Sequence, residues 1–151
     1  MPELSPAKQL DTFIAKYTPA MGKLMRAALK RMRVYMPGAD QMVYDNYNAL
    51  VVGFGPSQKA SQAILSIALF ADHASLCFLQ GAELDDPKKL LLGAGNVARH
   101  IKFKDESLFD DKDVKRLMDQ ALVSAKTPLD PKRKGEFVIK SVSEKQRPRR
   151  P

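Results

Sequence analysis

The chain of 151 residues has one cysteine, 7% aromatic residues and no long apolar run. A single cysteine excludes an internal disulfide, so an apolar core must stabilise the fold, and a chain of this length can form one. No apolar run reaches the ~18 residues that a membrane-spanning helix needs, and the first ten residues lack the apolar centre of a secretory signal. We therefore expect one domain, located in the cytoplasm, with no membrane partner.

Motifs that carry common enzyme chemistry are also missing. The glycines lack the spacing and the Lys-Ser/Thr pair of a phosphate-binding loop. Histidine and cysteine occur only as His73, Cys77 and His100, at best a three-ligand set, and we expect Cys77 to pack in the core. No nucleophile with a base stands at a convincing spacing. The sequence predicts no catalytic residue and no cofactor, and it leans towards a protein that is not an enzyme.

Positive charge is present but unevenly spread. Residues 126–151 carry nine basic and three acidic groups, residues 1–34 seven and two, and residues 35–125 nine and twelve. The segment 126–151 also has four prolines and few apolar residues, a composition that cannot offset the entropy of ordering. We expect one domain over 1–125 and a basic, mostly disordered tail over 126–151, with 137–139 as a short extended exception.

Helix and strand signals follow in a clear order. Ser5-Pro6 and Thr18-Pro19 are helix starts, each followed by apolar residues at helical spacing, and Pro37-Gly38 ends the second helix. The period then changes, and we expect hairpins from 43–44 with 49–54 and from 64–70 with 75–79. A short helix over 85–92, a fifth strand over 98–103 and an amphipathic helix capped by Asp110 or Asp111 complete the domain. The predicted class is α+β: N-terminal helices and a C-terminal helix on one curved antiparallel sheet of about five strands.

Several groups of side chains are candidate binding sites. Three tyrosines lie near the junction of the second helix and the first hairpin, and a histidine lies at a predicted turn: Tyr35, Tyr44, Tyr47 and His73. These side chains could line a cleft for a small ligand or a partner segment. Ordinary core or surface positions suit the tyrosines equally well. Four cations at spacings of three, four and three share one face of the second helix, which suits either a solvated face or an anion-binding or partner-docking stripe: Lys23, Arg26, Lys30 and Arg33.

Two further groups are charged. Carboxylates follow the fifth strand and suit either helix capping or a hard cation: Asp105, Glu106, Asp110 and Asp111. Cations of the tail suit either a solubilising segment or weak contact with polyanion phosphates, without the aromatic residues of a single-strand platform: Lys132, Arg133, Lys134, Arg147, Arg149 and Arg150.

Several strings resemble the YdhG-like family of bacterial domains of unknown function. They are LDTFIA (10–15), MPGAD (36–40), IALFADHASLCF (67–78) and ARHIKFK (98–104), with a tail string VIKSVSEKQRPR (138–149) similar to one proteobacterial branch. The resemblance covers roughly residues 8–125 and implies an α+β fold with helices on one curved antiparallel sheet. The family includes a proposed frataxin-like iron chaperone. The chain departs from the family pattern at Gln41, where many members have glutamate, and at 45–48, where the usual hairpin loop is replaced, and an acidic metal site there is not expected.

Three functions are therefore open from the sequence. The first is a non-catalytic module that binds a small ligand or a protein. The second, implied by the resemblance, is iron delivery with Asp105, Glu106, Asp110 and Asp111 as weak ligands. The third is non-specific association of the basic tail with nucleic acid, which would weaken steeply with salt.

Overall fold

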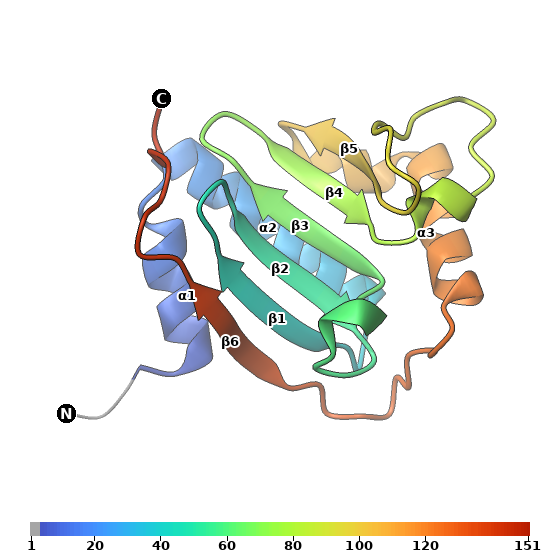
Figure 1. The fold of residues 1–151 in the computed structure, drawn as a ribbon, viewed down its shortest axis with the longest axis horizontal. Coiled ribbons are helices and arrows are strands. Elements are labelled where there is room, and N and C mark those ends of the chain that lie inside the picture. Colours follow the sequence, from blue (N-terminus) through green and yellow to red (C-terminus); the bar gives the residue numbers. More distant parts are fainter. Residues whose placement is uncertain (1–3) are drawn as a thin grey trace.

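The computed structural model describes residues 4–151, which form three α-helices and one six-stranded sheet (Figure 1). The helices are α1 (Pro6–Ile14), α2 (Pro19–Tyr35) and α3 (Lys112–Ser124). The strands are β1 (Asp40–Asp45), β2 (Leu50–Gly55), β3 (Leu65–Leu69), β4 (Ala74–Phe78), β5 (Arg99–Phe103) and β6 (Phe137–Val142). Short 3₁₀ turns are η1 (Ala60–Gln62), η2 (Gly81–Glu83) and η3 (Glu106–Asp110). The predicted α+β class is confirmed.

The helices begin at the caps that the sequence predicts. The side chains of Ser5 and Thr18 each accept a hydrogen bond from the amide three residues further on, both at 3.3 Å. Asp111, one of the two caps considered, accepts bonds from the amides two and three residues on, at 2.8 and 3.1 Å. These bonds satisfy amides that have no partner inside the helix. Within residues 4–151, no helix has the length and apolar character needed to cross a bilayer.

Both predicted hairpins are confirmed as neighbours in one sheet of order β5-β4-β3-β2-β1-β6. The pairs from β1 to β5 are antiparallel, and β6 runs parallel to β1. Val43 lies opposite Val52, and Ile67 lies opposite Leu76. The sheet is therefore mixed and has one strand more than the five expected.

The core lies between the three helices and one face of the sheet. Alternate strand residues such as Val52, Ile67 and Leu76 are fully buried in the same apolar cluster as Met25 of α2 and Leu117 of α3. Side chains between them point the opposite way, because successive residues of a strand face opposite sides. Figure 1 shows α2 behind the sheet and no α-helix across the front, where only the short η1 turn lies at one end. We call this side of β1 to β5 the open face.

The prediction of a helix over 85–92 is wrong. Two turn residues there are followed by an isolated bridge at Leu92 rather than by helical turns. The Asp86 carboxylate accepts hydrogen bonds from the amides of Leu90 and Leu91, both at 2.9 Å, and Lys89 has a φ of +54°. A carboxylate that bonds to backbone amides offers the chain an alternative to the helix.

Residues 126–151 also differ from the expected disorder. They form the C-terminal strap, which runs along one edge of the molecule, adds β6 beside β1 and then passes α1 (Figure 1). Phe137 and Ile139 pair with Gln41 and Val43, so the segment 137–139, which we expected to be extended, is the first half of β6. Composition missed the rest because buried carboxylates of β1 hold the strap, in addition to the few apolar side chains, such as Phe137 and Ile139, that pack against the core.

Candidate functional site

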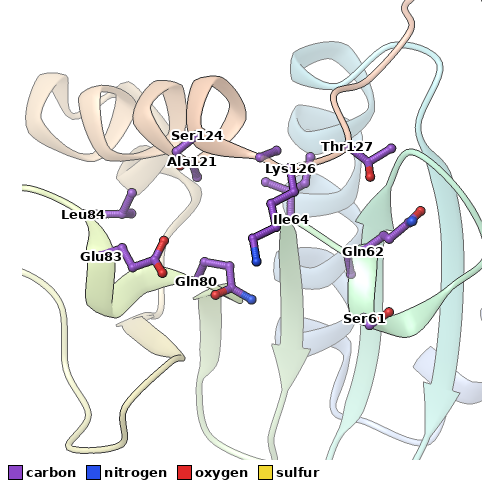
Figure 2. Close-up of a pocket in the computed structure, with 12 residues that line it drawn as sticks. Ser61, Gln62, Ile64, Gln80, Glu83, Leu84, Ala121, Ser124, Lys126 and Thr127 are labelled. Atoms are coloured by element: carbon purple, nitrogen blue, oxygen red, sulfur yellow. The ribbon is translucent and has the colours of Figure 1, made fainter.

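A partly enclosed hollow lies between η1, η2 and the C-terminal end of α3, and has a volume of about 310 Å³ (Figure 2). Its apolar lining includes Ile64, Leu84 and Ala121. Ligand pockets in proteins typically have volumes of ~300–1,000 Å³ and combine an apolar lining with a few polar groups. The hollow therefore has the size and lining of a small-molecule pocket.

Three polar side chains are directed into this pocket. Figure 2 shows the Glu83 carboxylate, the Gln80 amide and the Lys126 amino group converging on the same space. Among the described residues no ion pair within 4.0 Å joins Glu83 to Lys126. Two opposite charges thus line one pocket without neutralising each other through direct contact.

The local backbone brings the walls of the pocket together. Gly81 begins η2, and a Cβ at this position would lie 2.6 Å from the Cβ of Arg99, too close for any other residue. The missing side chain lets η2 pack against β5, which places Gln80 and Glu83 on the pocket wall. The opposite wall is made where the chain leaves α3 at Ser124 and turns into the strap, which supplies Lys126.

The four residues of the predicted cleft do not line a single site. Tyr35 lies on the helix side, where its hydroxyl donates to Asp119 of α3, and burial together with that contact raises the pKa of Tyr35. The other three lie in β1 or in hairpin loops: Tyr44 is opposite Val51 on the open face, and Tyr47 and His73 line separate hollows of that face. The prediction of one cleft between helix and hairpin is therefore wrong: Tyr35 lies on the helix side of the sheet, and Tyr44, Tyr47 and His73 lie on the open face.

The histidines and the cysteine meet on the open face. His73 stacks on Phe70 with ring centroids 4.6 Å apart, and its Nδ1 is 2.7 Å from the Asp72 carboxylate. Cys77 lies opposite His100 in the register of β4 and β5. Burial raises the pKa of the Cys77 thiol and lowers the pKa of His100. Among residues 4–151, no group of three or more His, Cys, Asp or Glu is arranged to hold a metal ion.

The helical stripe of cations is partly engaged by the protein itself. The Nε of Arg33 donates to Gln41 at 2.9 Å, and its guanidinium lies over the ring of Phe137. Arg26 is 3.9 Å from Asp11. Lys23 and Lys30 are the remaining members, so the stripe as a whole is not a continuous free anion site.

Most of the candidate iron ligands have structural partners. Asp105 accepts a hydrogen bond from the Ser107 amide at 2.8 Å and begins η3. Asp111 caps α3, and Asp110 pairs with Arg31 of α2. These contacts are the capping role that the sequence offered as one alternative, and iron binding by this group stays a prediction.

Each arginine of the tail contacts the rest of the chain, and Arg149 alone of the four is buried. Arg133 pairs with the buried carboxylate of Asp40 at 3.3 Å, and Arg149 pairs with that of Asp45 at 3.0 Å. Arg150 donates to the carbonyls of residues 15 and 16 at the end of α1. The side chain of Arg147 lies over the ring of Tyr47. The prediction of a free basic tail is therefore corrected. Of the six candidate cations, only Lys132 and Lys134 are exposed and make no side-chain contact within the described chain.

The described residues form an α+β domain with helices on one face of a mixed sheet, a partly enclosed pocket beside η2 and α3, and an open sheet face. In comparisons with known proteins, no family model, curated protein or solved structure matches the chain. The resemblance to the YdhG-like family stays a prediction from the sequence strings.

Sequence reasoning missed the pocket and the two carboxylates that hold the strap. The pocket residues come from three segments without a periodic signal, and Gln80, Glu83 and Lys126 are ordinary polar residues along the chain. The buried carboxylates had a weak signal. Asp40 and Asp45 flank the apolar pair Met42 and Val43, and a charge buried beside such a pair needs a cation as its partner.

Proposed function

We propose that this protein is a non-catalytic module that binds a small zwitterionic molecule, of the amino-acid type, in the pocket between η1, η2 and α3. The convergence of Glu83 and Lys126 on one pocket of about 310 Å³ carries the proposal. A ligand ammonium would lie against Glu83, a ligand carboxylate against Lys126, and its apolar part against Ile64 and Ala121. Charge-assisted hydrogen bonds of this kind are stronger than neutral ones and fix the orientation of a ligand.

The chemistry of the lining favours binding over catalysis. Hydroxyls are present at Ser61, Ser124 and Thr127, and the residues that line the pocket include no histidine and no cysteine. A serine nucleophile needs a neighbouring base, most often histidine, to take its proton. The lining supports recognition of charge and shape rather than covalent chemistry.

Isothermal titration calorimetry with three matched probes tests the proposal. The probes are leucine, the same carbon skeleton with only the amine, and the same skeleton with only the carboxylate. We expect leucine or another apolar amino acid to bind, and each single-charge probe to bind about tenfold more weakly or not at all. Equal affinity for all three probes would contradict the paired-charge site.

Variants locate the binding in the pocket. Glu83→Gln and Lys126→Met should each weaken binding about tenfold, because each removes one charged partner of the ligand. Glu144→Gln and Lys145→Met are matched controls, since these exposed residues lie elsewhere on the strap. A loss that is equal in the controls, or no saturable binding below the millimolar range with any apolar amino acid, would reject the proposal.

Three further expectations are kept as proposals. The sequence strings support membership of the YdhG-like bacterial family. A single cysteine is compatible with the cytoplasm as the proposed location. Iron delivery is the alternative function that the resemblance implies, and anaerobic calorimetry with ferrous iron tests it, with loss of the signal in Asp110→Asn as the supporting result.

A further inference from the structure

The open face carries two adjoining hollows that the pocket proposal does not use. Their volumes are about 650 and 390 Å³, and both include Ala68 and Phe70 in their lining. Cross-strand register places Tyr44, Val51, Ala68, Ser75 and Lys102 in one row over five strands. With strands ~4.8 Å apart, such a row is about 19 Å long. The two hollows are therefore parts of one continuous surface along the open face, which we call the track.

The charge of this track has one sign. Five side chains that line the two hollows are basic or imidazole groups, and none of the lining residues is an aspartate or glutamate: His73, Arg99, His100, Lys102 and Arg147. Asp72 is not one of the lining residues, but its carboxylate is in contact with His73 at the border of the track. A surface of this kind attracts anions and repels other cations.

Aromatic rings lie within the same track. The side chain of Tyr47 is 49% exposed, and the guanidinium of Arg147 lies 5.7 Å from its ring centroid. Phe70 and His73 form a stacked pair with an interplanar angle of 9°. Between them the sheet carries small side chains, Ala68 and Ser75, which let a flat group approach the strands.

We infer that the open face binds single-stranded nucleic acid, with bases stacked on Tyr47 and on the Phe70–His73 pair and phosphates held by Lys102 and Arg147. Stacking platforms for single strands combine a basic groove with exposed aromatic rings. A four-stranded sheet that stacks two or three bases is a known way for proteins to read single strands, and the row described above crosses five strands. An acidic peptide would be attracted by the charges but would leave the aromatic rings unused.

This inference is independent of the proposed function. The open face and the pocket share no lining residue, so one site can fail while the other stands. It also differs from the tail hypothesis. Of the strap cations it uses only Arg147, whereas Arg133 and Arg149 are bound to Asp40 and Asp45.

Fluorescence anisotropy with the full chain tests the inference. The probes are labelled thymidine and uridine oligomers of about ten nucleotides, the matching duplex, and an oligoglutamate peptide of similar charge. We expect the single strands to bind with a steep dependence on salt, and the duplex and the peptide to bind at least about tenfold more weakly. Equal binding of the peptide would show that charge alone acts and would overturn the inference, as would preference for the duplex.

Variants separate stacking from charge. Tyr47→Ala should weaken single-strand binding about tenfold, and Tyr47→Phe should restore it, because only the ring is needed. Lys102→Met and Arg147→Met together should reduce the slope of log affinity against log salt by about 1.4, the change expected for two phosphate contacts with a single strand.

Exposed cations of the strap provide the matched control. Lys132→Met with Lys134→Met removes the same charge from a segment that lies outside both hollows. If this control pair weakens binding as much as the Lys102 and Arg147 pair, or if the single strands do not bind below the millimolar range at low salt, the inference is wrong. Thermal unfolding checks that each variant is folded. If Arg147→Met does not fold, the salt dependence of Lys102→Met alone tests the inference.

Discussion

Asp45 and Arg149 form a buried ion pair, with Oδ1 and Nη2 3.0 Å apart and both side chains at most 5% exposed. The second carboxylate oxygen of Asp45 accepts from Lys16 at 2.7 Å. Asp40, at the other end of β1, receives Arg133 at 3.3 Å and the amide of Glu136 at 2.8 Å. The strap is thus fixed at both ends of the strand it covers, by carboxylates that have little access to water.

Arg149→Met should destabilise the fold by about 3 kcal/mol, because it leaves a buried carboxylate with only Lys16 as its cation. Chemical denaturation with urea at pH 7 measures the change. Lys145→Met is the matched control, since Lys145 is exposed on the same segment and should change the free energy of unfolding by less than about 0.5 kcal/mol. Equal stability of Arg149→Met and the parent would show that the pair contributes nothing.

The same carboxylate predicts a loss of stability in acid. Burial raises the pKa of Asp45, but hydrogen bonds from Lys16, Gln146 and Arg149 outweigh burial and hold it below the usual value. A lowered folded-state pKa adds stability above pH ~4, which is lost as the pH falls through the folded value. Unfolding free energies between pH 6 and pH 3 should therefore fall more steeply in the parent than in Asp45→Asn. A parallel pH dependence of the two proteins would contradict the assignment.

Gly135→Ala should lift the strap from the sheet where β6 begins. An added Cβ would lie 2.0 Å from the carbonyl oxygen of Ala39, and the backbone nearby is held by a 2.7 Å bond from the Gln41 amide to the Glu136 carbonyl. We expect the Gln41 amide to exchange its hydrogen at least about tenfold faster. Gly95→Ala is the control because nothing lies within 4 Å of its added Cβ. Unchanged exchange at Gln41 would mean that the strap tolerates the clash.

Tyr17→Phe should cost about 1–3 kcal/mol. The buried hydroxyl donates to the Leu69 carbonyl at 2.8 Å and accepts from the Leu50 amide at 3.2 Å, so its loss leaves two buried backbone groups without this partner. Tyr44→Phe removes only a long 3.9 Å contact to sulfur and serves as the control. Urea denaturation of both variants gives the comparison, and similar losses in the two would argue against a special role for the Tyr17 hydroxyl.

The elements with local signals were predictable, and those that depend on distant partners were not. Ser5 and Thr18 predict the starts of their helices because a cap acts within one helical turn. The hairpins are predicted by the alternation of apolar and polar residues over a few positions. The strap looked disordered because its partners, Asp40 and Asp45, lie more than ninety residues earlier. The predicted tyrosine group failed for a related reason, since residues close along the chain can face opposite sides of a sheet.

The order of the strands has a consequence for how the protein is made. Of the six described strands, β1 leaves the ribosome before the others and β6 after them, yet the two are neighbours at one side of the sheet. Until β6 arrives, β1 offers its free amides and carbonyls as an unprotected edge, the kind of edge that pairs with other chains. Synthesis proceeds from the N-terminal side, so a nascent sheet must wait through nearly one hundred residues before that edge is closed. Chaperones that shield strand edges would matter most for this protein during that interval.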